Sequence, residues 1–180
     1  MSKILVLFST HDGQTEGVAE RIGFRLSKAG HEVAVLSVDS PDASRGIDAS
    51  DAVIVGGAIR YGHFASSLAE FIRRNAPLLL SRPSAFYSVS LSAAKDAADA
   101  YALMAEFQAA TGWVPDDTAV FAGALRYSRY SPFMRFLMKR IARANGEETD
   151  TSHDYEYTDW KAVDRFAAAF ALKIATAAPA

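Results

Sequence analysis

The residues best suited to chemistry near the start of the chain are hydroxyl-bearing side chains grouped around a glycine. They follow a short apolar run and precede a segment with helical spacing of its apolar residues. The amides at a helix N-terminus bind anions, because they lie at the positive end of the helix dipole. The loop is therefore predicted to bind phosphate, and its hydroxyls suit a terminal monophosphate. Its residues are Ser9, Thr10, His11, Asp12, Gly13, Gln14 and Thr15.

The glycine spacing of this loop narrows the choice of ligand. The loop has neither the GxGxxG pattern of a dinucleotide-binding fold nor the GxxxxGK[ST] pattern of a P-loop, so a dinucleotide or a nucleoside triphosphate is disfavoured. Taken alone, the loop could also be a polar turn in which Ser9 or Asp12 caps the helix.

Two further loops follow apolar runs and could hold a flat ring. In an open α/β sheet, ligands bind at the carboxyl ends of the strands, so all three loops are expected to meet. Tyr61 and Ile59 would offer an aromatic and apolar face, unless Tyr61 and Phe64 only anchor the next helix. The two loops contain Ala58, Ile59, Arg60, Tyr61 and Gly62, and Ser88, Val89, Ser90, Leu91 and Ser92.

The elements that must position these loops are apolar runs alternating with amphipathic segments. Continuous apolar runs are typical of strands buried on both faces of a parallel sheet, and the alternation predicts right-handed βαβ crossovers. We expect one α/β domain spanning residues 1–180, a doubly wound sheet of five parallel strands. The strands are expected at 4–8, 31–38, 52–57, 85–91 and 118–125, and the last helix at 159–174.

Composition excludes several classes of function. The chain has no cysteine, which removes disulfides, thiolate nucleophiles and iron–sulfur clusters, and its histidines show no metal-ligand spacing. A net charge of −2 gives no overall attraction to nucleic acid. The sequence shows neither a signal peptide nor a membrane-spanning run, so we expect a cytoplasmic protein without a bound metal.

An insertion at residues 126–158 interrupts the alternation before the last helix. Its first half, up to Arg143, carries six basic residues and no acidic one, whereas residues 145–160 carry six acidic residues and no basic one. Insertions of this length are usually either functional or disordered. The residues in it that we single out for substrate binding are Arg126, Tyr127, Arg129, Arg135 and Lys139.

Residues 132–143 of the insertion are predicted to form a basic amphipathic helix. Phe133, Leu137 and Ile141 align on one face, and Arg135, Lys139 and Arg143 form a parallel basic stripe. Such a helix can lie at a membrane interface or cover the ligand. The alternative is that its apolar residues pack on the domain while the following acids neutralise the bases.

Six segments together resemble the menaquinone-dependent protoporphyrinogen IX dehydrogenases, which are flavodoxin-like enzymes. They occur in order and cover most of the chain from Phe8 to Trp160. The segments are FSTHDGQT, AIRYGH, PSAFYSV, AGALRY, GEETDT and YTDW.

The resemblance implies a flavodoxin-like sheet with strand order 2-1-3-4-5 and one noncovalent flavin mononucleotide (FMN). It implies oxidation of protoporphyrinogen IX to protoporphyrin IX, a step of haem biosynthesis, with menaquinone or ubiquinone as electron acceptor. Residues 10–15 would then hold the phosphate, residues 58–62 and 88–92 would flank the ring, and bases of the insertion would pair with porphyrin propionates. A peripheral position on the inner face of the cell membrane follows from the quinone.

Two residues depart from the expected phosphate loop. Asp12 stands where flavodoxin carriers have threonine, and His11 stands where we expect arginine. Asp12 is expected to turn towards amides at the helix start rather than towards a phosphate dianion. A flavodoxin-type electron carrier and an FMN-dependent quinone reductase remain alternatives, and the oligomeric state, including a homo-oligomer, is left open.

Overall fold

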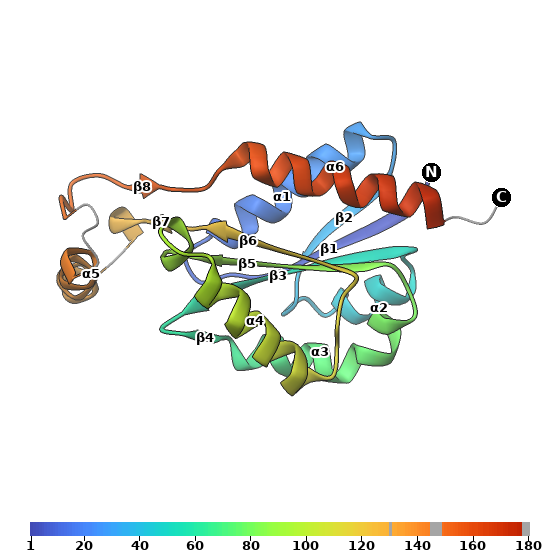
Figure 1. Ribbon diagram of the computed structural model, residues 1–180, viewed down its shortest axis with the longest axis horizontal. Coiled ribbons are helices and arrows are strands. Elements are labelled where there is room, and N and C mark those ends of the chain that lie inside the picture. The colour runs from blue at the N-terminus through green and yellow to red at the C-terminus, as the bar shows by residue number, and fades with distance from the viewer. Residues whose placement is uncertain (130, 145–148, 178–180) are drawn as a thin grey trace.

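A central parallel sheet forms the framework of the molecule (Figure 1). The computed structural model describes residues 1–129, 131–144 and 149–177. The strand order β2-β1-β3-β5-β6 is the predicted 2-1-3-4-5 when only the parallel strands are counted along the chain, so the fold prediction is confirmed. The strands are β1 (Lys3–Ser9), β2 (Glu32–Ser37), β3 (Ala52–Arg60), β5 (Ser84–Ser90) and β6 (Asp117–Ala122).

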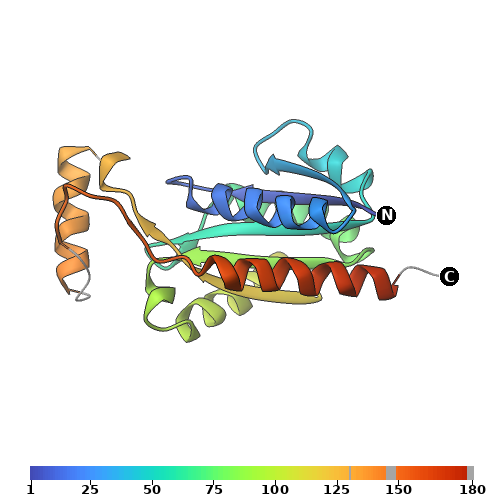
Figure 2. The same ribbon diagram turned by 90° about the horizontal axis from the view of Figure 1, so that it is seen from above.

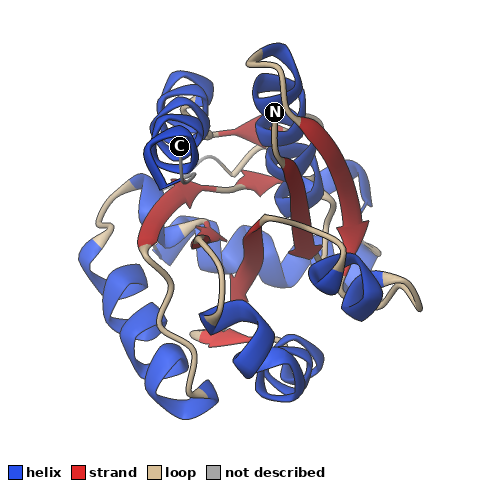
Figure 3. Ribbon diagram, turned by 90° about the vertical axis from the view of Figure 1, so that its right-hand side faces the viewer, coloured by secondary structure: helices blue, strands red, loops and turns tan. Residues whose placement is uncertain are grey.

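Helices cover both faces of this sheet, as Figure 1 and the end-on view in Figure 3 show. Side chains of β1 alternate between the two layers, with Ile4 and Val6 in one core and Leu5 and Leu7 in the other. A strand buried on both faces therefore needs the continuous apolar run seen in the sequence. The first layer contains α1 (Gln14–Lys28) and α6 (Trp160–Ala177), and the second contains α2 (Ala43–Asp48), α3 (Ser66–Leu80) and α4 (Ala98–Thr111).

Strand β3 runs three residues past its predicted end at Gly57. Residues Ala58 to Arg60 were expected in a loop, but β3 continues and pairs antiparallel with β4 (His63–Phe64). Tyr61 (φ 53°) and Gly62 (φ 77°) join the two strands, and positive φ at both central residues is the geometry of a tight hairpin turn. The expectation of a loop was wrong because the hairpin supplies backbone partners beyond the parallel sheet.

The fifth parallel strand ends at Ala122, so the predicted strand to Leu125 was too long. After Gly123 the chain leaves the main sheet and forms β7 (Ala124–Leu125), which pairs antiparallel with β8 (Tyr155–Glu156). The carbonyl of Gly123 accepts a hydrogen bond from the amide of Tyr157 (3.0 Å), which fixes the start of this small sheet.

The rest of the insertion contains a short helical turn, η2 (Tyr127–Arg129), and the helix α5 (Pro132–Ala144). The helix predicted at 132–143 is therefore present. It stands apart from the sheet and its covering helices, beyond β7 and β8 and at the opposite end from both termini (Figures 1 and 2). In the described part of the chain, no helix has the length and apolar character needed to cross a bilayer.

Candidate functional site

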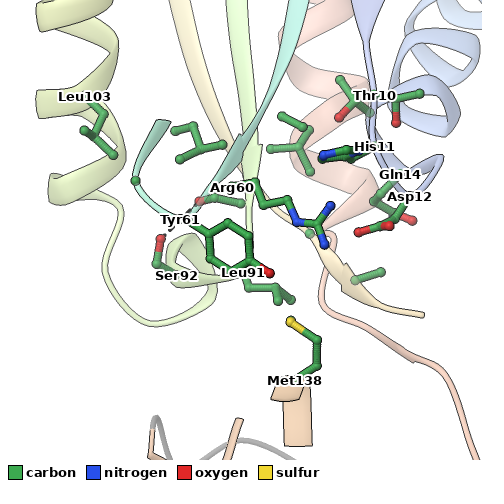
Figure 4. Close-up of a pocket in the computed structure, with 18 of the residues that line it drawn as sticks. Thr10, His11, Asp12, Gln14, Arg60, Tyr61, Leu91, Ser92, Leu103 and Met138 are labelled. Atoms are coloured by element: carbon green, nitrogen blue, oxygen red, sulfur yellow. Dashed lines mark hydrogen bonds between the residues drawn. The ribbon is translucent and has the colours of Figure 1, made fainter. Parts of the chain in front are cut away.

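The three predicted loops meet at the carboxyl ends of neighbouring strands and enclose a pocket of about 360 Å³ (Figure 4). The β1, β3 and β5 ends are adjacent because Ser9 pairs with Gly57, and Gly57 with Ser88. A volume of this order is typical of a small-molecule site. The predicted residues that line the pocket are Thr10, His11, Asp12, Gln14, Thr15, Ala58, Ile59, Arg60, Tyr61, Gly62, Val89, Ser90, Leu91 and Ser92.

The loop after β1 is shaped by a left-handed glycine. Gly13 has φ 87° and stands at the N-cap of α1, a conformation that side-chain-bearing residues rarely adopt. Its amide donates to Thr10 Oγ1 (3.0 Å), which closes the loop, while the hydroxyl of Thr10 keeps its own hydrogen for a ligand. The first amides of α1 lie next to this turn and give the positive end of the helix to the pocket.

Tyr87 of β5 holds the start of α1 in place through a hydrogen bond. Its side chain is fully buried, and its hydroxyl donates to the carbonyl oxygen of Thr15 (3.0 Å). The ring lies against Gly56 of β3, where a Cβ atom would overlap the ring. Burial raises the pKa of the Tyr87 phenol, so this group stays protonated and remains a donor.

The β3–β4 hairpin places an aromatic ring at the mouth of the pocket (Figure 4). Tyr61 is a non-glycine residue with positive φ, a conformation that costs about 1–2 kcal/mol. The residue is 59% exposed although it lines the pocket, and the Arg60 guanidinium carbon lies 5.1 Å from the ring centroid. Strain of this kind concentrates at binding sites, where the side chain is held out for a ligand.

The loop after β5 is held by serine hydroxyls. Ser90 Oγ lies 3.2 Å from Ser92 Oγ and accepts from the amide of Ala93 (3.3 Å), while the Ser90 carbonyl accepts from the amide of Gly123 (2.9 Å). These bonds turn the chain into η1 (Ser92–Ala94) and leave Leu91 on the pocket wall.

Five further residues line the pocket that the sequence did not indicate. Leu103 from α4 and Met138 from α5 reach the pocket (Figure 4), and Asp99 of α4 also lines it. Met138 is 7% exposed and packs with Leu125 and Tyr127 in a small core of the insertion. No local pattern marks these residues, because helix packing alone decides which side chains reach the site. The remaining two are Gly123 and Ala124.

Three predicted cofactor-binding residues do not line the pocket. Gly13 acts through its backbone, as described above. Ser9 is buried at the end of β1. Ser88 is fully buried in β5, and among the described residues its hydroxyl has no hydrogen-bond partner.

The described residues that were predicted to bind substrate lie in the insertion and do not line this pocket. Arg126 donates to Gln14 Oε1 (2.6 Å), and Tyr127 is fully buried with its ring 6.3 Å from that of Tyr155. Arg135 and Lys139 line a second cavity on α5. The side chain of Arg129 falls outside the described residues.

The residues present fit a flavin. One end of the pocket offers hydroxyls and the amides of a helix N-terminus, which suit a phosphate, and the other offers Tyr61, Ile59 and Leu91, which suit a flat ring. Within the described ranges, no group of His, Asp and Glu side chains is placed to hold a metal ion.

Comparison with known proteins agrees with this geometry. The family model of the flavodoxin domain matches residues 5–152. The structure of oxidised flavodoxin 2 from Bacillus cereus has the same fold, with a TM-score of 0.57 and 19% identity over 95% of this chain and 99% of that chain. The chain thus belongs to the flavodoxin domain family.

Two similar proteins narrow the family further. A protoporphyrinogen IX dehydrogenase (quinone) from Escherichia coli K12 is 42% identical over 170 residues, covering 92% of each chain. A protein of the same name from Leishmania major is 38% identical over 173 residues, covering 94% of this chain and 74% of that one. Within the flavodoxin class, the chain is a member of this dehydrogenase family.

Proposed function

We propose that this protein is an FMN-dependent oxidoreductase that oxidises protoporphyrinogen IX to protoporphyrin IX and passes the electrons to a respiratory quinone, in haem biosynthesis. The observation that carries the proposal is the 42% identity with the E. coli enzyme over 92% of both chains. The pocket supports it, because three loops at the sheet edge form a cradle with a polar end and an apolar end.

FMN is the flavin that suits the polar end. The turn at Gly13 and the hydroxyls of Thr10 and Thr15 would hold one phosphate group, and the loop has no glycine pattern for a pyrophosphate. When bound, FMN supplies hydride acceptance from the porphyrinogen and hydride or electron donation to the quinone.

The protein's own residues bind and orient the reactants. Residues 10–15 would hold the phosphate by amides and hydroxyls, and residues 58–62 and 89–92 would flank the ring. Leu91 and Met138 exclude water from the outer side of the pocket, and Arg60 brings a positive charge to its mouth. We assign no catalytic base.

The insertion supplies positive charge for the substrate's two propionates. Arg135 and Lys139 line a cavity on α5 together with Phe136, next to the helix face that carries Met138. Guanidinium and ammonium groups pair with carboxylates through charge-assisted hydrogen bonds. Arg126, which donates to Gln14, and Arg129 add to the positive charge of the insertion, and Tyr127 lies in its core.

The same helix is proposed to contact the inner face of the cell membrane through residues 132–143. Phe133 is 75% exposed and Phe136 is 60% exposed, and the Arg140 guanidinium carbon lies 6.0 Å from the Phe136 ring centroid. Exposed aromatic rings beside basic side chains are typical of helices that lie in a lipid interface. A quinone dissolved in the bilayer would then reach the pocket from this side.

Anaerobic turnover tests the proposed function. Protein loaded with FMN should convert protoporphyrinogen IX to fluorescent protoporphyrin IX when a menaquinone analogue is present, at a rate far above that of free FMN with the same quinone. Porphyrin fluorescence that rises no faster than in the FMN control contradicts the proposal.

An electron carrier and a nicotinamide-driven quinone reductase are the competing functions. A net charge of −2 with a basic insertion fits poorly with the strongly acidic surface by which carriers are steered to basic partners. A reductase would be bleached by NADH or NADPH without oxygen. The proposed enzyme should be bleached by protoporphyrinogen IX and not by either nicotinamide.

A further inference from the structure

The side chain of Gln14 lies between the phosphate loop and the insertion. Gln14 is the first residue of α1, is 6% exposed and lines the pocket. Its Oε1 accepts from Arg126 Nη2 (2.6 Å), and its Nε2 donates to Glu156 Oε1 (2.7 Å) and to Thr158 Oγ1 (2.8 Å).

These bonds use both hydrogens of the Gln14 amide group. The side chain therefore has no donor left for a phosphate, and only its backbone amide can serve the ligand. The amide oxygen faces a guanidinium and the amide nitrogen faces a carboxylate, so the group dipole is aligned with both charges. Hydrogen bonds to charged partners are about twice as strong as neutral ones.

The partners of Gln14 stand at the two ends of the insertion. Arg126 directly follows β7, and Glu156 is the last residue of β8. Thr158 links Gln14 to the main sheet, because its hydroxyl also donates to the carbonyl of Ala122 (2.7 Å) at the end of β6. One side chain from α1 thus joins the strand that enters the insertion, the strand that leaves it, and the edge of the main sheet.

The position of the insertion matters to the pocket because α5 contributes Met138 to its wall. Met138 packs on Leu125 and Tyr127, which lie next to Arg126 in the chain. A shift at the two ends of the insertion therefore moves the outer wall of the pocket. A phosphate held by the amides of residues 10–15 would contact the first turn of α1, which carries the Gln14 side chain.

We infer that Gln14 is a positioning residue that couples flavin binding at the phosphate loop to the seating of the insertion over the pocket. Such coupling is reciprocal, so a seated insertion also strengthens flavin binding. The expected effect of Gln14 on porphyrinogen binding rests on the proposed function. The coupling between flavin and insertion rests only on the FMN binding of that proposal and does not require porphyrinogen turnover.

A charge exchange between two positions tests the inference. In Gln14→Glu the new carboxylate still accepts from Arg126, but it cannot donate to Glu156 or Thr158 and it faces the Glu156 charge. Adding Glu156→Gln restores a donor to the pair. Gln108→Glu on α4 makes the same change of charge away from the pocket and serves as the control.

Three measurements are made on each folded holoprotein: the FMN dissociation constant from flavin fluorescence, the rate of tryptic cleavage within α5 with and without excess FMN, and KM against kcat for protoporphyrinogen IX. Cleavage in a helix needs local opening, so it reports how firmly the insertion is seated. In the wild type, excess FMN should slow this cleavage.

Gln14→Glu should weaken FMN binding and speed cleavage, each by about tenfold, and should remove the effect of FMN on cleavage. It should raise KM by about tenfold and leave kcat within about twofold, because the flavin's chemistry is untouched. The double variant should recover most of each change, and Gln108→Glu should match the wild type.

Wild-type cleavage rates and FMN dependence in a folded Gln14→Glu protein, or no recovery in the double variant, overturn the inference. If Gln14→Glu does not fold, Glu156→Ala at the exposed end of β8 replaces it and should show the same direction in all three measurements. Coupling of FMN to cleavage without porphyrinogen turnover would refute the proposed function and leave the inference standing.

Discussion

Asp12, a residue of the phosphate loop, brings a negative charge to the pocket. A carboxylate repels each unit of negative charge on a phosphate by about 1 kcal/mol at a separation of 4 Å in water-like surroundings, and salt screens part of the total. Asp12→Asn should therefore tighten FMN binding by about threefold to tenfold. Riboflavin, which lacks the phosphate, is the control ligand and should bind both proteins equally. Equal FMN affinities, measured by fluorescence titration, would show that Asp12 is directed away from the phosphate.

Ser88 was predicted to bind the cofactor, but it lies inside the sheet with an unpartnered hydroxyl among the described residues. Removing a buried, unpaired polar group relieves a desolvation penalty, so Ser88→Ala should raise the free energy of unfolding by about 1 kcal/mol. Its FMN affinity should not change.

Ser84 is the matched position for this test. It is also buried in β5, but its Oγ accepts from Trp113 Nε1 (3.3 Å). Ser84→Ala should lower the free energy of unfolding by about 1 kcal/mol, because it leaves the indole donor unpaired. Urea unfolding of both variants measures the difference, and the same sign of change in both would refute this account of Ser88.

The sequence predicted those pocket residues that come directly after the strands β1, β3 and β5 or at their ends. Residues 10–12, 14, 15 and 58–62 line the pocket, since strand ends in a parallel sheet must meet at one edge. The use of the Gln14 side chain could not be predicted, because its partners are 112 to 144 residues away along the chain. Pairing at such distances leaves no local pattern.

At the scale of elements, Gly56 and Tyr87 make strands β3 and β5 fit each other. The tyrosine ring fills the space that a side chain at position 56 would need, and its hydroxyl holds the start of α1. Gly56→Ala should destabilise the protein by about 1–3 kcal/mol through overpacking. Tyr87→Leu should also destabilise it and weaken FMN binding.

The two changes should not be additive, because the smaller side chain makes room for the new methyl group. The double variant should be more stable than the sum of the single effects by about 1 kcal/mol or more. Thermal unfolding of the four proteins measures this interaction. Additive effects would mean that the two side chains do not compete for the same space.

The pair Arg21–Asp164 joins α1 to α6, the two helices on one face of the sheet. Arg21 donates from Nε and Nη2 to the two carboxylate oxygens, both at 2.7 Å, and these bonds lower the pKa of Asp164. A carboxyl whose folded pKa is below its unfolded value of about 3.9 stabilises the fold above that pH and loses the effect as pH falls through the folded pKa.

Asp164→Asn should therefore lower Tm by a constant amount at neutral pH, and the difference from the wild type should shrink below about pH 4. Asp48→Asn on α2, remote from this interface, is the control. A difference that grows on acidification would contradict the assigned direction of the pKa shift.

The order of strands and helices could be predicted because the apolar residues of each element repeat with the spacing of a strand or of a helix. Hydrophobic runs gave β1, β3 and β5, and the confirmed strand order came with the family resemblance. The sequence did not predict three features that have no hydrophobic repeat of their own. They are the hairpin beyond Gly57, the short helix α2, and the point at Gly123 where the chain leaves the main sheet.

At the scale of the whole molecule, α5 is an exposed basic helix at one end of the domain (Figure 2). Wild-type protein should bind phosphatidylglycerol vesicles more strongly than phosphatidylcholine vesicles, and less at high salt. Phe133→Ser/Phe136→Ser should weaken vesicle binding by about tenfold or more, since both rings would otherwise enter the lipid interface.

Val114→Ser/Leu172→Ser is the matched control, because Val114 (66% exposed) and Leu172 (69% exposed) are apolar residues far from α5 in the chain. This variant should bind vesicles like the wild type. Cosedimentation measures both proteins. Equal losses, or no loss in the Phe133/Phe136 variant, would refute membrane contact through this helix.

The adjacent strands β7 and β8 give the insertion a narrow neck, since the chain leaves the domain and returns to it side by side. A graft between Ala122 and Tyr157 has to span only the width of two paired strands. The insertion can therefore be replaced in evolution while the flavodoxin framework stays intact. Related chains can acquire different reductants or a different location in the cell without changes to the sheet.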